Sequence, residues 1–186
     1  MYKKVKWPAG AMIAPVPAVL VTSGNKEKSN VMTIAWTGIL NTIPANTYIS
    51  VRKERYSYDL IKESGEFAIN LTTRELAKAT DFCGVRSGKD MDKFKVMNLT
   101  RQDANEISCP IIGESPVSLE CRVTDIVELG SHDMFIADIL AVDVAEELID
   151  KNGRLALEKA DLIAYCHGEY FALGEKLGKF GYTVKK

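Results

Sequence analysis

The sequence predicts a mainly β protein, an antiparallel barrel with peripheral helices. Strand-like segments outnumber helical segments along the 186 residues, and one helical segment interrupts the strands early. Two long strand patterns, at 117–129 and 134–145, are separated by a short junction that is typical of a hairpin. Because strands and helices do not alternate regularly, a parallel sheet of βαβ units is disfavoured.

The first half of the chain contains four strand patterns, each apolar or alternating and bounded by turn residues. They lie at 16–22, 30–36, 47–53 and 66–71. We expect a loop between the second and the third. In the third strand, Ser50 and Arg52 are two residues apart, so they share one face and point into the same space.

The turn after the third strand concentrates positive charge where a helix is expected to begin. Arg52, Lys53 and Arg55 lie in this turn, Ser57 is placed to cap the helix, and Gly65 can end it. Free N–H groups at a helix start favour an anion, and guanidinium groups can form paired hydrogen bonds with phosphate oxygens. The turn therefore suggests a phosphate-ester cofactor, with a solvated basic loop as the alternative.

Two further helical segments are expected before the long strands. Thr72 opens a segment with the spacing of a capping box, which predicts a short helix through Ala79. Residues 82–95 are expected to form a loop, in which Asp90 caps a turn at 91–94.

The end of the chain combines a polar segment, one more strand and an apolar tail. The polar segment at 146–161 predicts a loop with a helical turn, and 162–165 is expected to be the last strand. Beyond Gly168, the tail at 168–186 carries several apolar and aromatic side chains. We expect this tail to pack at a subunit interface, and the alternative is that it folds back over its own barrel.

Length and composition define the class of protein. One domain spanning 1–186 is expected, large enough to bury a core without disulfides or a structural metal. A formal net charge of −1 disfavours nucleic-acid or anionic-membrane partners. No apolar run approaches the roughly 20 residues that cross a bilayer, and no secretory pattern opens the chain. We therefore expect a cytoplasmic protein.

The cysteines and histidines do not form a recognisable metal or redox motif. None of the four cysteines belongs to a Cys-x-x-Cys pair, so reduced thiols are expected, with Cys121 in the core and Cys83 accessible in a loop. His132 and His167 are too far apart for an i,i+4 pair, and no metal site is expected. His132 lies in the hairpin junction, where it either is solvated or supplies a hydrogen bond or proton to a cofactor.

Common nucleotide and hydrolase motifs are excluded. The segment from Gly84 to Lys89 resembles a phosphate loop but is one residue short, and Asp90 stands where Ser or Thr should bind magnesium. No G-x-G-x-x-G follows a strand, so a Rossmann domain is not supported. No G-x-S-x-G nucleophile elbow occurs.

Taken together, several short pieces resemble the flavin reductase-like FMN-binding split-barrel proteins, particularly the flavoredoxin branch. These pieces occur in matching order along most of the chain. They are Asn30-Val31-Met32-Thr33 with Ala35, Ile49-Ser50-Val51-Arg52 with Arg55-Tyr56-Ser57, Glu66-Phe67-Ala68-Ile69-Asn70, Ser87-Gly88 with Asp92-Lys93-Phe94, Gly130-Ser131-His132, and the tail from Tyr170 to Gly181. One departure is Lys53, which stands where some relatives carry proline.

The resemblance implies a six-stranded Greek-key split barrel, a homodimer and FMN at the dimer interface. Backbone contacts to the flavin ring would come from the segment that includes Asn30, Val31, Met32, Thr33 and Ala35. The ribityl phosphate would be held by residues of the basic turn and a later loop: Ser50, Val51, Arg52, Arg55, Tyr56, Ser57, Ser87 and Lys89. His132 would lie near the flavin or a nicotinamide pocket.

The implied chemistry is electron transfer through flavin, because the cofactor supplies the redox capability. The first hypothesis is an oxidoreductase that passes electrons from NAD(P)H through FMN to an acceptor. The second is an electron carrier of the flavoredoxin type that a redox-protein partner reduces. The third is a flavin-storage or small-ligand-binding protein without turnover.

Overall fold

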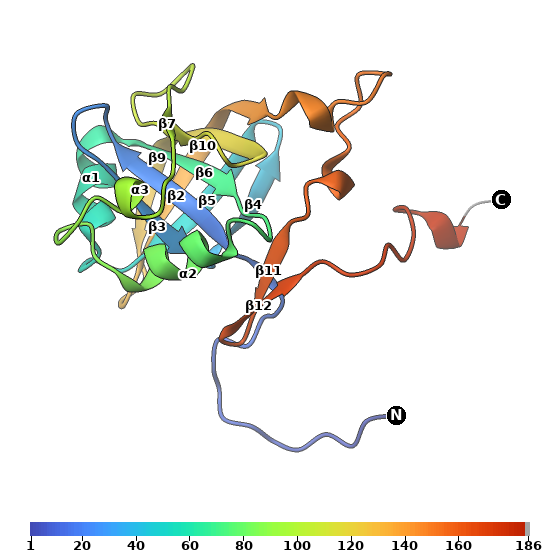
Figure 1. Cartoon of the computed structure of the whole chain (residues 1–186). Helices are drawn as coiled ribbons and strands as arrows, with labels where there is room; N and C mark the ends of the chain where they lie inside the picture. The colour runs from blue at the N-terminus through green and yellow to red at the C-terminus, as the bar shows by residue number, and fades with distance from the viewer. Residues whose placement is uncertain (185–186) are drawn as a thin grey trace.

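The computed structural model describes residues 1–184 and shows a curled sheet with helices packed around it (Figure 1). Residues 185 and 186 of the predicted tail lie outside the described part. The strands are β1 Val16–Pro17, β2 Val19–Gly24, β3 Ser29–Ile34, β4 Thr37–Thr42, β5 Ala45–Val51, β6 Glu66–Leu71, β7 Arg101–Gln102, β8 Ile111–Ile112, β9 Val117–Glu128, β10 Asp133–Val144, β11 Ile163–Cys166 and β12 Glu169–Ala172. The helices are α1 Tyr56–Ser64, α2 Ala77–Val85 and α3 Lys93–Val96, with 3-10 turns η1 Glu146–Leu148, η2 Leu157–Lys159 and η3 Tyr182–Val184.

The main sheet has the order β3-β2-β6-β9-β10-β5-β4, and all its neighbours pair antiparallel. β3 and β5 are far apart in this order, yet their inward side chains meet in one apolar cluster. The sheet therefore curls on itself, and the predicted mainly β antiparallel barrel is confirmed. The resemblance implied six strands, whereas the main sheet has seven within residues 1–184.

The hairpin of β9 and β10 forms as predicted and places its tip beside the basic turn. At the tip, Asp133 pairs with Glu128 across the hairpin. Asp133 also pairs with Val51, the last residue of β5. The register between β9 and β10 shifts twice farther along, as expected where a long hairpin bends around a barrel.

α1 closes one end of the barrel. Its Tyr58 and Ile61 side chains are buried in the same cluster as the inward side chains of the strands. Gly65 ends the helix as predicted, with φ of 69° and its N–H donating to Ile61 O at 2.8 Å. Glycine adopts this left-handed conformation without the steric cost of a Cβ.

α2 and α3 cover the outer face of β2 and β3. Leu20 and Val31 pack there against Cys83 of α2 and Phe94 of α3. Because its other face meets the barrel core, β2 is buried along its whole length. Within residues 1–184, no helix has the length and apolar character needed to cross a membrane.

The predicted start of α2 is wrong. The helix predicted from Thr72 through Ala79 begins at Ala77 and continues to Val85, into the predicted loop. Thr72 follows the end of β6 and instead donates its hydroxyl to the carbonyl of Ala18, between β1 and β2. A capping-box pattern was thus outcompeted by a tertiary hydrogen bond.

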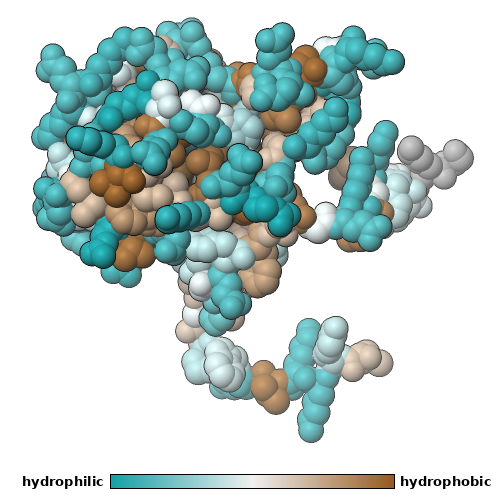
Figure 2. Space-filling model, viewed as in Figure 1, coloured by the Kyte–Doolittle hydropathy of each residue, from teal (hydrophilic) through white to brown (hydrophobic). Residues whose placement is uncertain are grey.

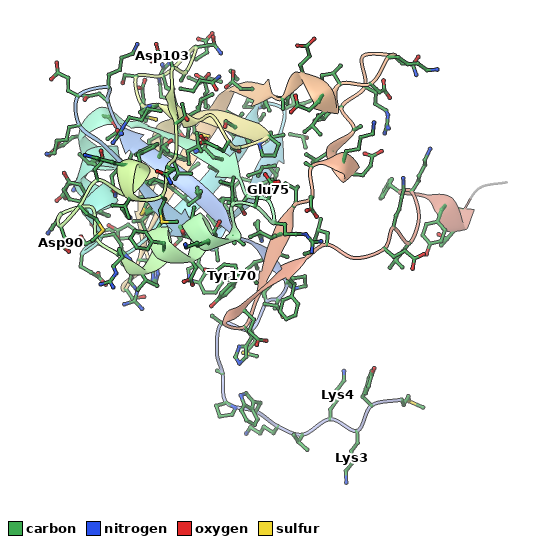
Figure 3. The ribbon with its side chains drawn as sticks, viewed as in Figure 1. Lys3, Lys4, Glu75, Asp90, Asp103 and Tyr170 are labelled. Atoms are coloured by element: carbon green, nitrogen blue, oxygen red, sulfur yellow. The ribbon has the colours of Figure 1, made fainter. Side chains whose placement is uncertain are left out.

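The cap of α3 also differs from the prediction. Asp92, not Asp90, precedes the helix, and its carboxylate accepts a hydrogen bond from Lys95 N at 3.3 Å. Asp90 is exposed on the preceding loop (Figure 3).

Three strand predictions need correction. The strand predicted at 16–22 is divided at Ala18, because β1 pairs with β11 while β2 joins the main sheet. The loop predicted before the third strand contains β4, an edge strand whose Ile39 is exposed, so no buried face marks it in the sequence. The strand predicted at 162–165 is not the last, since β12 follows the turn at Gly168.

Three of the cysteines are buried and the fourth is half-buried, and all four are free thiols. Cys121 lies in the barrel core as predicted. The prediction for Cys83 is wrong, because it lies in α2 and is buried rather than accessible. Burial raises the pKa of the Cys83 thiol to about 11, so this residue is protonated and unreactive near neutral pH.

Two segments project from the barrel (Figure 1). Residues 1–14 contain no helix or strand, and Figure 3 shows Lys3 and Lys4 on this arm, away from the body. The tail after β12 leaves in another direction. Trp7 on the arm and Phe180 on the tail are exposed, and Figure 2 shows hydrophobic surface on both segments.

Candidate functional site

The basic turn connects β5 to α1 and leaves the start of the helix open. The Arg55 N–H donates to Arg52 O at 3.1 Å, which closes the turn. Arg55 occupies the N-cap with an extended backbone, and within the described residues no side chain caps the helix. The first N–H groups of α1 therefore remain available to an anion.

Ser57 does not cap the helix, contrary to the prediction. It lies inside the first turn, where it is buried, and its hydroxyl accepts a hydrogen bond from Asn30 Nδ2 at 2.8 Å. This bond joins the beginning of β3 to the start of α1. Two segments that the resemblance assigned to one cofactor are therefore in direct contact.

A first cavity of about 380 Å³ lies between β3, the end of β5 and the hairpin tip. Ser50 and Arg52 both line it, which confirms the prediction that they face the same space. His132 reaches it from the hairpin, with its Nδ1 2.9 Å from Ser131 Oγ. The lining residues are Met32, Thr33, Ile34, Ala35, Trp36, Ser50, Val51, Arg52, Arg55, His132 and Tyr165.

A second cavity of about 230 Å³ lies at the start of α1. Met32 and Arg55 line both cavities, so the two adjoin. The lining residues are Asn30, Met32, Glu54, Arg55, Tyr56, Ser57, Val85, Arg86, Ser87, Gly88 and Lys93.

Gly88 allows the loop after α2 to approach the second cavity closely. A Cβ at this position would lie 2.2 Å from Asn30 Oδ1 and 2.7 Å from Tyr56 Cδ1. Asn30 cannot easily move away, because it is bonded to Ser57. Only glycine therefore brings the loop backbone this close to the cavity.

The three cations of the basic turn have different partners. Arg55 donates to Gly84 O at 3.1 Å and thereby contacts the end of α2. Arg52 pairs with Glu54 at 3.3 Å, and both side chains are largely exposed. Lys53 points toward the hairpin and away from the cavities, so Arg52 and Arg55 supply the turn's charge to the site.

Lys93 adds a buried cation to the second cavity. Its ammonium donates to Cys83 O at 3.0 Å and to Arg86 O at 3.1 Å, which fixes the loop after α2. Burial lowers the pKa of Lys93 to about 8. An ammonium has three donors, so one remains for an anion in the cavity.

Two predicted site residues do not face the cavities. Val31 is buried in the cluster under α2 and α3, and Lys89 is exposed on the loop. The residues that sequence reasoning missed are Trp36, Arg86, Gly88, Lys93 and Tyr165. Gly88 and Lys93 lie in pieces that carried the resemblance, whereas no local pattern marks Trp36 or Tyr165.

The adjoining cavities fit a molecule with a planar ring at one end and a phosphate at the other. The second cavity offers guanidinium, ammonium and hydroxyl donors around an open helix start. The first offers a strand edge, an indole and polar side chains in a space large enough for a ring system. A curled antiparallel barrel with such a site suits a cofactor that combines a ring system with a phosphate.

The chain belongs to the family described as flavin reductase like domain, which residues 12–174 match. This membership supports a flavin cofactor and an oxidoreductase class for the chain. The resemblance stated from the sequence is thus confirmed.

Solved structures and curated relatives agree with this membership. The chain is similar to flavoredoxin of Desulfovibrio vulgaris (Miyazaki F), with 31% identity, a TM-score of 0.91, and 98% of this chain and 100% of that chain covered. A flavoredoxin from Methanosarcina acetivorans shows 27% identity and a TM-score of 0.87, with 99% and 100% covered. A protein named NADPH-flavin oxidoreductase from Streptomyces viridifaciens is 27% identical over 145 residues, 76% of this chain and 74% of the relative.

Proposed function

We propose that this chain binds FMN across the two cavities and is an oxidoreductase that takes electrons from NAD(P)H. The phosphate would occupy the second cavity and the ring system the first. The observation that carries the proposal is the close approach of Gly88 to Asn30, which brings loop backbone, helix start and Arg55 around one small polar space. This space suits one phosphate rather than the longer pyrophosphate of FAD.

The residues of the site have distinct proposed roles. Arg55, Ser57 and Ser87 bind the phosphate, with Lys93 holding the loop against it. The strand segment from Asn30 to Ala35 supports the ring, and Ser50 and Arg52 border it. His132 donates a hydrogen bond or a proton at the hairpin edge. Bound FMN would supply the two-electron chemistry.

The cofactor is tested by extracting and chromatographing the flavin from purified protein. We expect FMN, and predominantly FAD or no flavin after reconstitution would contradict the proposal.

Arg55→Ala should weaken FMN binding about ten- to a hundredfold, because it removes a charge-assisted phosphate contact. Arg52→Ala should have a smaller effect, since Arg52 is already paired with Glu54. Quenching of flavin fluorescence measures both.

The electron donor is either a nicotinamide or a redox protein, and we propose a nicotinamide. A relative named NADPH-flavin oxidoreductase supports a nicotinamide donor. The likeness to two flavoredoxins supports the second candidate, a carrier that a redox-protein partner reduces. Oxidation of NADH and NADPH by the purified protein, with and without added FMN, separates them. Turnover supports the enzyme, and a stoichiometric flavin that neither nicotinamide reduces supports the carrier.

A homodimer is also part of this proposal. The apolar side chains on residues 1–14 and on the tail are exposed in the single chain, as are those of the edge strand β4. Tyr165 and Trp36 border the first cavity on the side of the projecting segments. We therefore expect a second copy to cover these surfaces and complete the ring end of the site.

Light scattering of the holoprotein tests the dimer. Truncation after Ala172, which preserves β12, should lower both the dimer mass and the flavin content. A monomer with a full complement of FMN would show that one chain builds the whole site.

A further inference from the structure

A buried carboxylate lies where the hairpin tip meets the basic turn. Asp133 is almost completely buried at the hairpin tip. Its Oδ2 accepts a hydrogen bond from Tyr58 Oη at 2.6 Å and lies 3.4 Å from Lys53 Nζ. Its Oδ1 is also buried and has no hydrogen-bond partner within residues 1–184.

A buried carboxylate is costly to keep unless charged and hydrogen-bonding partners compensate it. Tyr58 and Lys53 are the partners here, and they come from α1 and from the basic turn. Lys53 also contacts Glu128 Oε2 at 3.3 Å, on the other strand of the same hairpin. The ammonium therefore bridges two carboxylates of the hairpin tip.

This contact joins the two segments that carry the charged site residues. Lys53 lies between Arg52 and Arg55 in the turn, and Asp133 directly follows His132 in the hairpin. The turn is also held by the Arg55 N–H bond to Arg52 O and by the Arg55 side-chain bond to Gly84 O, but neither bond reaches the hairpin. The Asp133 carboxylate thus sets where the turn lies relative to the hairpin tip.

We propose that Asp133, acting through Lys53 and Tyr58, is a positioning residue that places the guanidinium group of Arg55 for the cofactor phosphate. The inference rests on the proposed binding of FMN. It also assigns a role to Lys53, the position where the chain departs from some relatives: the ammonium anchors the turn and does not bind the phosphate.

The two flavins that differ only in the phosphate provide a selective test. Riboflavin and FMN share the ring and the ribityl chain, but only FMN presents an anion to the turn. Loss of the Asp133 tether should therefore weaken FMN binding about two- to thirtyfold and leave riboflavin binding unchanged. A loss of general stability would weaken both.

The variants are Tyr58→Phe and Lys53→Met, each of which removes one partner and leaves the carboxylate in place. Lys53→Arg restores the ion pair and should bind FMN like wild type. Glu120→Gln is the matched control, because Glu120 is an equally buried carboxylate whose partners are the backbone N–H groups of 105–107. Dissociation constants for both flavins are measured by fluorescence quenching on apo-protein whose fold circular dichroism has verified.

Limited trypsin digestion of the apo-protein gives a second readout that does not depend on flavin. Tyr58→Phe retains the basic residues of the turn and should be cleaved faster after Arg52 or Arg55 than Glu120→Gln, as mass spectrometry of the fragments would show. Unchanged cleavage would mean that the contacts of Asp133 with Tyr58 and Lys53 do not restrain the turn, and it would overturn the proposal.

The binding results separate this proposal from the proposed function. A wild-type protein that prefers FMN, with variants that keep the full preference or lose both flavins equally, overturns the positioning role alone. A wild-type protein that binds riboflavin and FMN equally overturns the phosphate role of the turn, and the positioning role with it. Selective loss of FMN affinity with rescue by Lys53→Arg supports the proposal.

Discussion

The two cavities differ in how firmly the chain builds them. In the second cavity, buried polar groups are bonded to their neighbours, because Asn30 donates to Ser57 and Lys93 donates to two carbonyls. Gly88 approaches Asn30 closely, while Arg55 and Arg86 of the same cavity are exposed. The first is bordered by partly exposed side chains, among them Trp36, and by Tyr165 from the strand pair that projects from the barrel.

This difference teaches that the two ends of the site serve different purposes. A preorganised anion cradle binds at little conformational cost and supplies affinity for a phosphate. An open ring end leaves room for an electron donor or acceptor to approach. Changes in the second cavity should therefore discriminate FMN from riboflavin, whereas changes in the first should affect both flavins alike.

The largest expected effect comes from filling the space beside Gly88. Gly88→Val should weaken FMN binding about a hundredfold, because the new side chain must displace Asn30 or Tyr56 from the cradle. Asn152→Val is the control, since Asn152 is exposed and lines neither cavity. Titration of both apo-proteins with FMN measures the difference, and equal affinities would show that the loop is free to move.

The second effect is a pH dependence carried by Lys93. Its pKa of about 8 means that the ammonium is charged below this pH and neutral above it. The second pKa of the FMN phosphate is about 6, so the phosphate remains mostly a dianion between pH 7 and pH 9. FMN affinity should therefore fall as pH rises through 8, by at most about tenfold per pH unit.

Lys93→Met serves as the comparison for this pH profile. Without the titrating ammonium, FMN affinity should be lower at pH 7 and nearly flat between pH 7 and 9. Riboflavin affinity in the wild type should also be flat. The same slope in both proteins would assign the titration to another group.

A smaller effect on flavin affinity is expected from a change in the first cavity. Trp36→Ala should weaken FMN and riboflavin equally, about two- to tenfold, because the indole contributes apolar and stacking contact to a ring but none to a phosphate. Val142→Ala is the control, because Val142 is an exposed apolar residue that lines neither cavity. A loss confined to FMN would mean that the ring does not lie beside Trp36.

The smallest effect is a gain. Glu54 lines the second cavity, so its carboxylate repels a phosphate bound there. Glu54→Gln should strengthen FMN binding about two- to fivefold at low salt, and added salt should cancel the gain. Glu63→Gln on the exposed side of α1 controls for net charge. Weaker binding would show that Glu54 supports the turn.

The sequence predicted the parts of the fold that have a buried face or a special backbone conformation. The strand at β6, the long hairpin and the helix end at Gly65 were all identified from such local signals. β4 was missed because an edge strand with exposed apolar residues shows no alternation. The start of α2 was misplaced because the Thr72 hydroxyl is bonded to the carbonyl of Ala18, 54 positions away in the sequence.

The residues of the candidate site also differ in whether a local sequence pattern marks them. Arg52 and Arg55 were found because the charges are contiguous and precede a helix. Trp36 and Tyr165 come to the first cavity only when the barrel has formed, so no local pattern marks their positions. The role of Ser57 was mistaken for the same reason, since its partner Asn30 is 27 positions away.

The pairing of β10 with β5 affects the order in which parts of the chain fold. The β9–β10 hairpin joins neighbours in the sequence, whereas Asp133 meets Val51 only after a long loop has closed. Distant pairings form slowly, so the hairpin should gain structure before the basic turn docks on its tip. In refolding from denaturant, strand formation followed by circular dichroism should precede the quenching of added flavin. The cofactor would then report the last step of folding.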